Sequence, residues 1–166
     1  MGDVEIVRMG AESVDRFEPL WESLRAHHAS LEPRIEMIDP QRSWELRRDI
    51  EIGFLAHPDA FALLATRDGR DIGYAVVTIH PGPDDTWVTG DRIAEVETLS
   101  VVPEERGSGG GTALLDRVDA ELTAAGIHDL QIAVVAVNDD ARRFYERRGL
   151  RPRIIVLSRL TGESGG

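Results

Sequence analysis

The chain has 166 residues, 42% hydrophobic and 30% charged, a size and balance that suit one globular domain over residues 1–160 with a flexible tail at 161–166. It contains no cysteine and no lysine, which excludes disulfides, thiolate nucleophiles, cysteine metal sites and Schiff-base chemistry. Its net charge of −11 repels nucleic acid and favours cationic partners, although by itself such a charge is better explained by solubility alone.

The first half of the chain alternates between a period of two, typical of strands, and the helical spacing of apolar residues. In chain order we expect a strand at 4–8, a helix at 13–28, a loop at 30–40, a helix from Pro40 to about His57, and strands at 60–66 and 72–79. Pro40 suits the first turn of its helix, and Asp68-Gly69 suits the tight turn of a hairpin.

The second half predicts strands that alternate with helices. In chain order we expect a strand at 93–102, a helix from the following glycines to Gly126, a strand at 130–137, a helix at 141–148 and a last strand at 154–157. Residues 130–137 are apolar and β-branched, as in strands buried on both faces. The whole pattern favours one α+β domain, antiparallel in its front half and β-α-β in its back half.

A glycine-rich segment, Arg106-Gly107-Ser108-Gly109-Gly110-Gly111, joins a strand to an amphipathic helix. The first turn of a helix leaves N–H groups unpaired and partly positive, and glycines let an anion approach them. The segment therefore predicts a phosphate-binding site. A P-loop requires a lysine, and a dinucleotide-binding loop requires a glycine where Thr112 stands, so both of these classes are disfavoured.

Two segments together resemble the signatures of the GNAT superfamily of N-acetyltransferases. Leu99-Ser100-Val101-Val102-Pro103, followed by Arg106 to Gly111, is similar to Leu-x-Val-x-Pro and Arg/Gln-x-x-Gly-x-Gly/Ala. Residues 138–150 are similar to Asn-x-x-Ala-x-x-Phe-Tyr-x-x-x-Gly-Phe, with Leu150 as the one departure. The resemblance, whose motifs cover residues 93–150, implies acetyl-CoA as co-substrate. It also implies a GNAT-like fold: a mixed, mostly antiparallel sheet with two splayed parallel strands, flanked by helices.

The resemblance also implies which residues hold the coenzyme. Residues 106–111 would wrap the pyrophosphate through backbone N–H groups, and Thr112 would add its hydroxyl. The backbone of Leu99, Ser100 and Val101 would lie along the pantetheine arm, which Asn138 would touch. One of Arg142 and Arg143 would meet the 3′-phosphate, although each also suits an ordinary solvated helix face.

For catalysis, the resemblance implies that Tyr145 contacts the coenzyme sulfur and protonates the departing thiolate, as a phenol can at neutral pH. Glu95 and Glu97 are the candidate bases, Glu95 at a position that is the base in some family members; a water or no dedicated base is the alternative. Strand alternation predicts both glutamates on one face with Leu99 and Val101. With no cysteine to carry an acetyl group, direct transfer within a ternary complex is expected.

The expected acceptor is an amine of a small molecule or a protein, and the net charge leans toward a cationic one. No metal is expected, because the adjacent His27 and His28 face different directions on a helix. Homodimers are common in the family. No long apolar run predicts a membrane span, no secretory signal is visible, and the cytoplasm is the expected location. The alternative function is a non-catalytic module that binds acyl-CoA.

Overall fold

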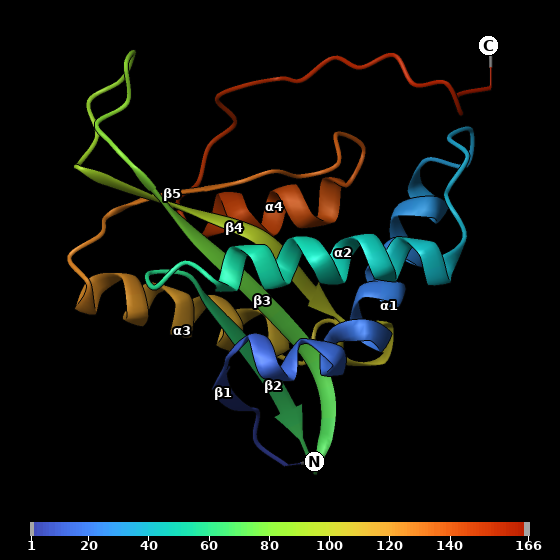
Figure 1. The fold of residues 1–166 in the computed structure, drawn as a ribbon, viewed down its shortest axis with the longest axis horizontal. Helices are drawn as coiled ribbons and strands as arrows, with labels where there is room; N and C mark the ends of the chain where they lie inside the picture. Colours follow the sequence, from blue (N-terminus) through green and yellow to red (C-terminus); the bar gives the residue numbers. More distant parts are fainter. Residues whose placement is uncertain (1, 165–166) are drawn as a thin grey trace.

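The computed structural model describes residues 2–164 and is built on a five-stranded sheet in the order β1-β2-β3-β4-β5 (Figure 1). The strands are β1 (Glu5–Met9), β2 (Phe61–Arg67), β3 (Arg70–Pro81), β4 (Arg92–Val101) and β5 (Asp129–Ile132). Strands β1 to β4 pair antiparallel, and β5 pairs parallel with β4. This arrangement confirms the predicted α+β fold with a mixed, mostly antiparallel sheet.

Helices cover both faces of the sheet. They are α1 (Glu18–Leu31), α2 (Pro40–Leu55), α3 (Gly110–Ala124) and α4 (Asp139–Arg147). On one face, α3 buries Leu114 and Val118 in a core with Ala75 and Val77 of β3. On the other face, a second core joins residues of α1 and α2 to Tyr74 and Val76. None of the helices among residues 2–164 has the length and apolar content needed to cross a bilayer.

Both helices of the front half begin at a proline in the first turn. Helix α2 begins at Pro40, as predicted, and the Asp39 side chain accepts a hydrogen bond from the Arg42 amide. The predicted helix at 13–28 instead starts as a 3₁₀ helix over Ala11–Phe17 and becomes α-helical at Glu18. Pro19 explains the switch, because proline lacks an N–H and is best placed in the first turn of an α-helix.

The two parallel strands separate after a short stretch of pairing. Residues 93–96 of β4 pair with 129–132 of β5, and the rest of β4 has no β5 partner in the part of the chain that is described. The predicted strand at 130–137, buried on both faces, is therefore wrong beyond Ile132. Residues 130 and 132 are only partly buried, because β5 is the edge of the described sheet and lacks cover on one side.

The predicted last strand at 154–157 is also wrong. Ile154, Ile155, Val156 and Leu157 lie in an extended segment with side chains 71%, 83%, 84% and 90% exposed. Beyond this segment, the Glu36 amide donates to the carbonyl of Gly162, and the Ser164 amide donates to that of Arg34. The division into a domain over 1–160 and a flexible tail stays a prediction, and residues 165–166 lie outside the described part.

Candidate active site

The start of α3 presents backbone amides that no helical bond uses. The first bond of the helix runs from the Ala113 amide to the Gly109 carbonyl, so the amides of residues 110–112 precede it. Gly107 and Gly109 have φ values of +76° and +92°, which other residues adopt only with strain. A Cβ at either glycine would meet no heavy atom within 4 Å, so both open to free space. The helix start therefore fits an anionic group such as a pyrophosphate.

A buried ion pair lies directly beneath this loop. The side chain of Arg67 is 4% exposed and that of Glu105 is 6% exposed, and Arg67 Nη1 lies 3.3 Å from Glu105 Oε2. Arg67 Nη2 also donates to the carbonyl oxygen of Ser108 at 2.8 Å. The pair ties the glycine loop to β2. Sequence reasoning missed it, because residues 60–66 showed a plain apolar strand and nothing local links Arg67 to Glu105.

Arg106 points back toward the strand rather than out of the loop. Its Nε donates to the carbonyl oxygen of Val101 at 3.2 Å, and its Nη1 lies 3.4 Å from Nδ1 of His27. Burial lowers the pKa of His27 below its ordinary value, and the charge of Arg106 lowers it further. The contact therefore joins the C-terminal part of α1 to the end of β4, and the lowered pKa favours the neutral imidazole there.

Residues 97–101 of β4 form the strand edge that β5 leaves open. Ser100 is buried, and its hydroxyl donates to the carbonyl oxygen of Leu20 at 2.8 Å, which ties β4 to α1. The side chains of Leu99 and Val101 pack into the core under α3. These three residues can therefore offer a ligand their backbone N–H and C=O groups, as expected for an extended arm that lies along a strand.

Strand β4 contains a bulge at Glu97. The register with β3 skips Glu97, and across the bulge the alternation of faces reverses. Glu95 and Thr98 consequently lie on the face toward α2, whereas Leu99 and Val101 lie on the face toward α3. The expectation that both glutamates share a face with Leu99 and Val101 is wrong for this reason.

Five polar side chains meet where β4 begins to separate from β5. Thr78, Glu95 and Gln131 lie opposite one another on β3, β4 and β5. Gln131 donates to Glu95 Oε2 at 2.9 Å, and Thr78 donates to Glu97 Oε1 at 2.6 Å. Nε2 of His80 lies 3.5 Å from Glu95 Oε2 and 3.8 Å from Glu97 Oε1. The two predicted bases are thus brought together, with three partners that sequence reasoning did not find.

His80, Glu95 and Glu97 could also ligate a metal ion, because their ligand atoms lie within 4.8 Å of one another. Both carboxylates already accept hydrogen bonds from protein donors. The expectation of a metal-free site stays a prediction. His80 was missed because the predicted strand ended at residue 79, although Tyr74, Val76, Thr78 and His80 continue one period-two face.

Helix α2 contacts the bulge of β4 through the side chain of Arg47. Arg47 Nη2 donates to the carbonyl oxygen of Glu97 at 3.1 Å and to the hydroxyl of Thr98. Its Nε donates to Oε1 of Glu51 at 3.0 Å, and Tyr74 donates to the same oxygen at 2.9 Å. Glu51 is fully buried, and burial raises the pKa of its carboxyl although the charge of Arg47 opposes the shift.

The predicted residues at the start of α4 make local contacts. Oδ1 of Asn138 accepts from the Ala141 amide at 3.2 Å, which caps the helix, and the amide nitrogen of this side chain can still donate to a ligand. Both arginines form ion pairs within the helix: Arg142 with Asp139 and Glu146, and Arg143 with Asp140. Both side chains remain about half exposed, so a phosphate could still compete for either one.

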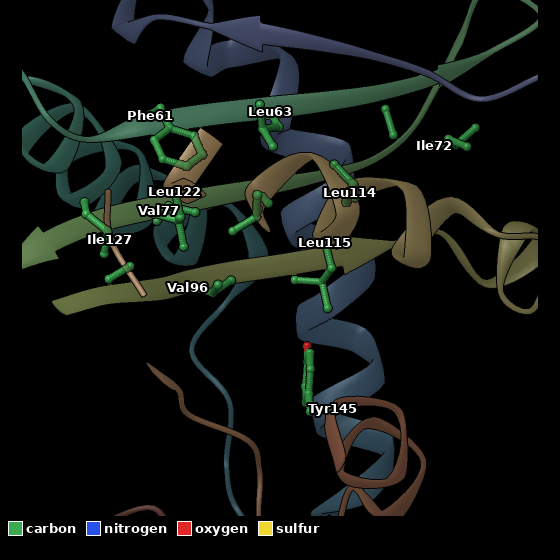
Figure 2. Close-up of a cluster of buried hydrophobic side chains, with 14 residues drawn as sticks. Phe61, Leu63, Ile72, Val77, Val96, Leu114, Leu115, Leu122, Ile127 and Tyr145 are labelled. Carbon is green, nitrogen blue, oxygen red and sulfur yellow. The ribbon is translucent and has the colours of Figure 1, made fainter. Parts of the chain in front are cut away.

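Tyr145 lies on the buried face of α4, in the same hydrophobic cluster as Leu115 of α3. Figure 2 shows its hydroxyl oxygen pointing from α4 toward Leu115. The residue is 9% exposed, and burial raises the pKa of its phenol well above the ordinary value. Burial therefore favours the protonated phenol, which can donate a hydrogen bond.

Comparison with known proteins agrees with this geometry. The sequence profile of the Acetyltransferase (GNAT) family matches residues 20–150. A mycothiol acetyltransferase from Thermobispora bispora is 32% identical over 149 residues, covering 87% of this chain and 46% of that protein. The chain thus spans about half the length of the curated relatives it matches.

Solved structures show the same fold at low sequence identity. A GCN5-related N-acetyltransferase from Ralstonia eutropha superposes with a TM-score of 0.74 at 18% identity, covering 96% of this chain and 100% of that chain. An aminoglycoside N-acetyltransferase, AAC(6')-Iy in complex with CoA, superposes with a TM-score of 0.69 at 15% identity, covering 97% of both chains. By its matched profile, its curated relatives and its fold, the chain belongs to the Acetyltransferase (GNAT) family.

Proposed function

We propose that the protein transfers the acetyl group of acetyl-CoA directly to an amine within a ternary complex. The observation that carries the proposal is the alignment of three features along one line of the fold. These are the open amides at residues 110–112, the unpaired edge of β4 at 97–101, and the carboxylates of Glu95 and Glu97 where the strands separate. Their order fits a ligand with a diphosphate at one end and a reacting thioester at the other.

Each part of the site has a role in this proposal. The amides of α3 hold the pyrophosphate, and Arg67 and Glu105 keep the loop in the receiving shape. The edge of β4 aligns the pantetheine arm, and acetyl-CoA supplies an acetyl group already activated as a thioester. Glu95, with Glu97 beside it, takes a proton from the amine, and Tyr145 gives a proton to the departing sulfur.

The acceptor side carries negative charge. Two carboxylates lie close together at the site, and the whole chain has a net charge of −11, so a cationic amine is the proposed acceptor. A structural neighbour is named aminoglycoside N-acetyltransferase, and a relative is named mycothiol acetyltransferase, so amino sugars are the first compounds to test. The cytoplasmic location, a homodimer, and the absence of nucleic-acid and membrane partners stay predictions.

The test is a thiol-release assay with acetyl-CoA across a panel of amines, analysed by initial velocities. We expect release that depends on both substrates and gives intersecting double-reciprocal lines. Parallel lines would contradict direct transfer. Tight binding of acetyl-CoA without release for any amine would instead favour an acyl-CoA-binding module.

A thermal-shift screen separates this proposal from other phosphate ligands. We expect acetyl-CoA to raise the melting temperature and ATP and NAD to leave it unchanged, since only a ligand that binds the folded state stabilises it.

A further inference from the structure

We propose that His80 is the proton exit of the site: it accepts the proton that Glu95 and Glu97 remove from the amine and releases it to solvent. The inference rests on the proposed function and extends it to a residue outside the family signatures described above. It is carried by the position of His80 between two carboxylates and the solvent.

The reaction itself requires such an exit. When the acceptor arrives as an ammonium ion, transfer forms a C–N bond, breaks a C–S bond, and yields an amide, a thiol and one proton. Of the two protons that the nitrogen loses, one replaces the proton that Tyr145 gives to the sulfur, and the other must leave the site. A carboxylate that kept this proton could not serve as a base in the next turnover.

The exposed fraction of the side chain increases from Glu97 to Glu95 to His80, in the direction in which the proton is proposed to leave. The side chains of Glu97, Glu95 and His80 are 18%, 28% and 48% exposed, respectively. Nε2 of His80 is within 4 Å of an oxygen of each glutamate, at 3.5 Å and 3.8 Å, so one imidazole serves both. A histidine fits the task, because a neutral imidazole has one ring nitrogen that can accept a proton and a second that can donate one.

The surroundings hold His80 in place. Nε2 lies 3.0 Å from the hydroxyl oxygen of Thr78, and Thr78 donates its proton to Glu97. Because the Thr78 proton is donated to Glu97, the Thr78 hydroxyl oxygen can accept a hydrogen bond from Nε2 when the imidazole ring is protonated. Gln131 of β5 donates to Oε2 of Glu95, the oxygen that faces the imidazole. The charged groups that face His80 are therefore Glu95 and Glu97 of β4.

From α2, Arg47 contacts β4 at the carbonyl oxygen of Glu97 and at the hydroxyl of Thr98. Arg47 is also paired with the buried Glu51. Its charge is thus partly balanced within the core. The two glutamates remain the groups that attract a proton toward His80.

The experiment compares the wild type with His80→Gln, and uses His57→Gln, an exposed histidine after α2, as the matched control. Turnover is measured at low buffer concentration with and without added imidazole, together with the acceptor KM and the melting temperature. For His80→Gln we expect kcat to fall about tenfold or more. Added imidazole should raise the kcat of this variant several-fold, because a small base can replace a missing proton carrier. The wild type and His57→Gln should not respond to imidazole.

Two results would overturn the proposal. One is an unchanged kcat in His80→Gln. The other is a loss that imidazole does not restore and that follows a raised acceptor KM or a lowered melting temperature, as expected for a structural role. If the wild type turned over no amine, both the proposed function and the role of His80 would be contradicted. If the wild type were active and His80→Gln equally active, only the role of His80 would be contradicted.

Discussion

A carboxylate placed at Gly109 should block the coenzyme, while the same change at Gly126 should not. Gly109 precedes α3 with φ of +92°, and Gly126 follows it with φ of +71°, and a Cβ at either meets nothing within 4 Å. Glutamate at either position therefore carries the same strain of about 1–2 kcal/mol. Each variant should lose about 2–8 °C in melting temperature.

The two variants should differ in binding. A glutamate carboxylate about 4 Å from a phosphate charge repels it by about 4 kcal/mol at an effective dielectric constant of 20. Screening at the exposed loop reduces this to about 2 kcal/mol, which is about 30-fold in Kd. We therefore expect Gly109→Glu to bind acetyl-CoA at least 30-fold more weakly than the wild type, and Gly126→Glu to bind it within about threefold.

Isothermal titration of both variants with acetyl-CoA measures this difference directly. A circular-dichroism melt of each variant checks that the strain is matched. If the two variants bound acetyl-CoA equally well, the pyrophosphate would not lie at the start of α3, and the reasoning for the whole site would be refuted.

Three further predictions follow from the site and its support. Tyr145→Phe should lower kcat by at least about tenfold and leave the Kd for acetyl-CoA within about threefold; an unchanged kcat would remove its role as the acid. Glu95→Gln should lower kcat by about 100-fold and Glu97→Gln by less than about tenfold in thiol-release assays, and the reverse order would make Glu97 the base. Because the pKa of Glu51 is raised in the folded protein, its ionisation opposes folding, and the contribution of Glu51 to stability should fall as pH rises above about 4.5. In urea titrations, the unfolding free energy of Glu51→Gln, which keeps the Oε1 acceptor, should rise relative to that of the wild type from pH 4.5 to pH 8. Glu51→Leu removes the acceptor of both Arg47 and Tyr74 and should lose about 3 kcal/mol or more at both pH values.

Local patterns in the sequence predicted what depends on local structure. The glycine loop and α3 were found because a strand, glycines and helical spacing follow one another directly along the chain. Pro40 marked the start of α2 for the same reason. The order and type of the strands up to β4 were also predicted, since period-two alternation and a turn at Asp68-Gly69 set them.

Features that depend on pairing between distant segments could not be predicted this way. The bulge at Glu97 exists only in the register between β3 and β4, and it decides which face each side chain of β4 takes. Residues 154–157 have the composition of a strand, but a strand also needs a partner, which composition does not provide. The contacts of His80 with Glu95 and Glu97, and of Arg67 with Glu105, join residues 15 or more positions apart, beyond any local pattern.

The hydrogen bond from Arg47 to the carbonyl oxygen of Glu97 connects helix α2 to the backbone of a proposed base. Helix α2 lies on the sheet face that carries Glu95 and His80, so under the proposed function changes along this helix should alter which amines are accepted (Figure 1). Any change that tilts the helix also pulls on the backbone of a candidate base. Variants selected for a new amine should therefore tend to be slow at first, and second changes that restore their speed should cluster around Arg47, Glu51 and Thr98.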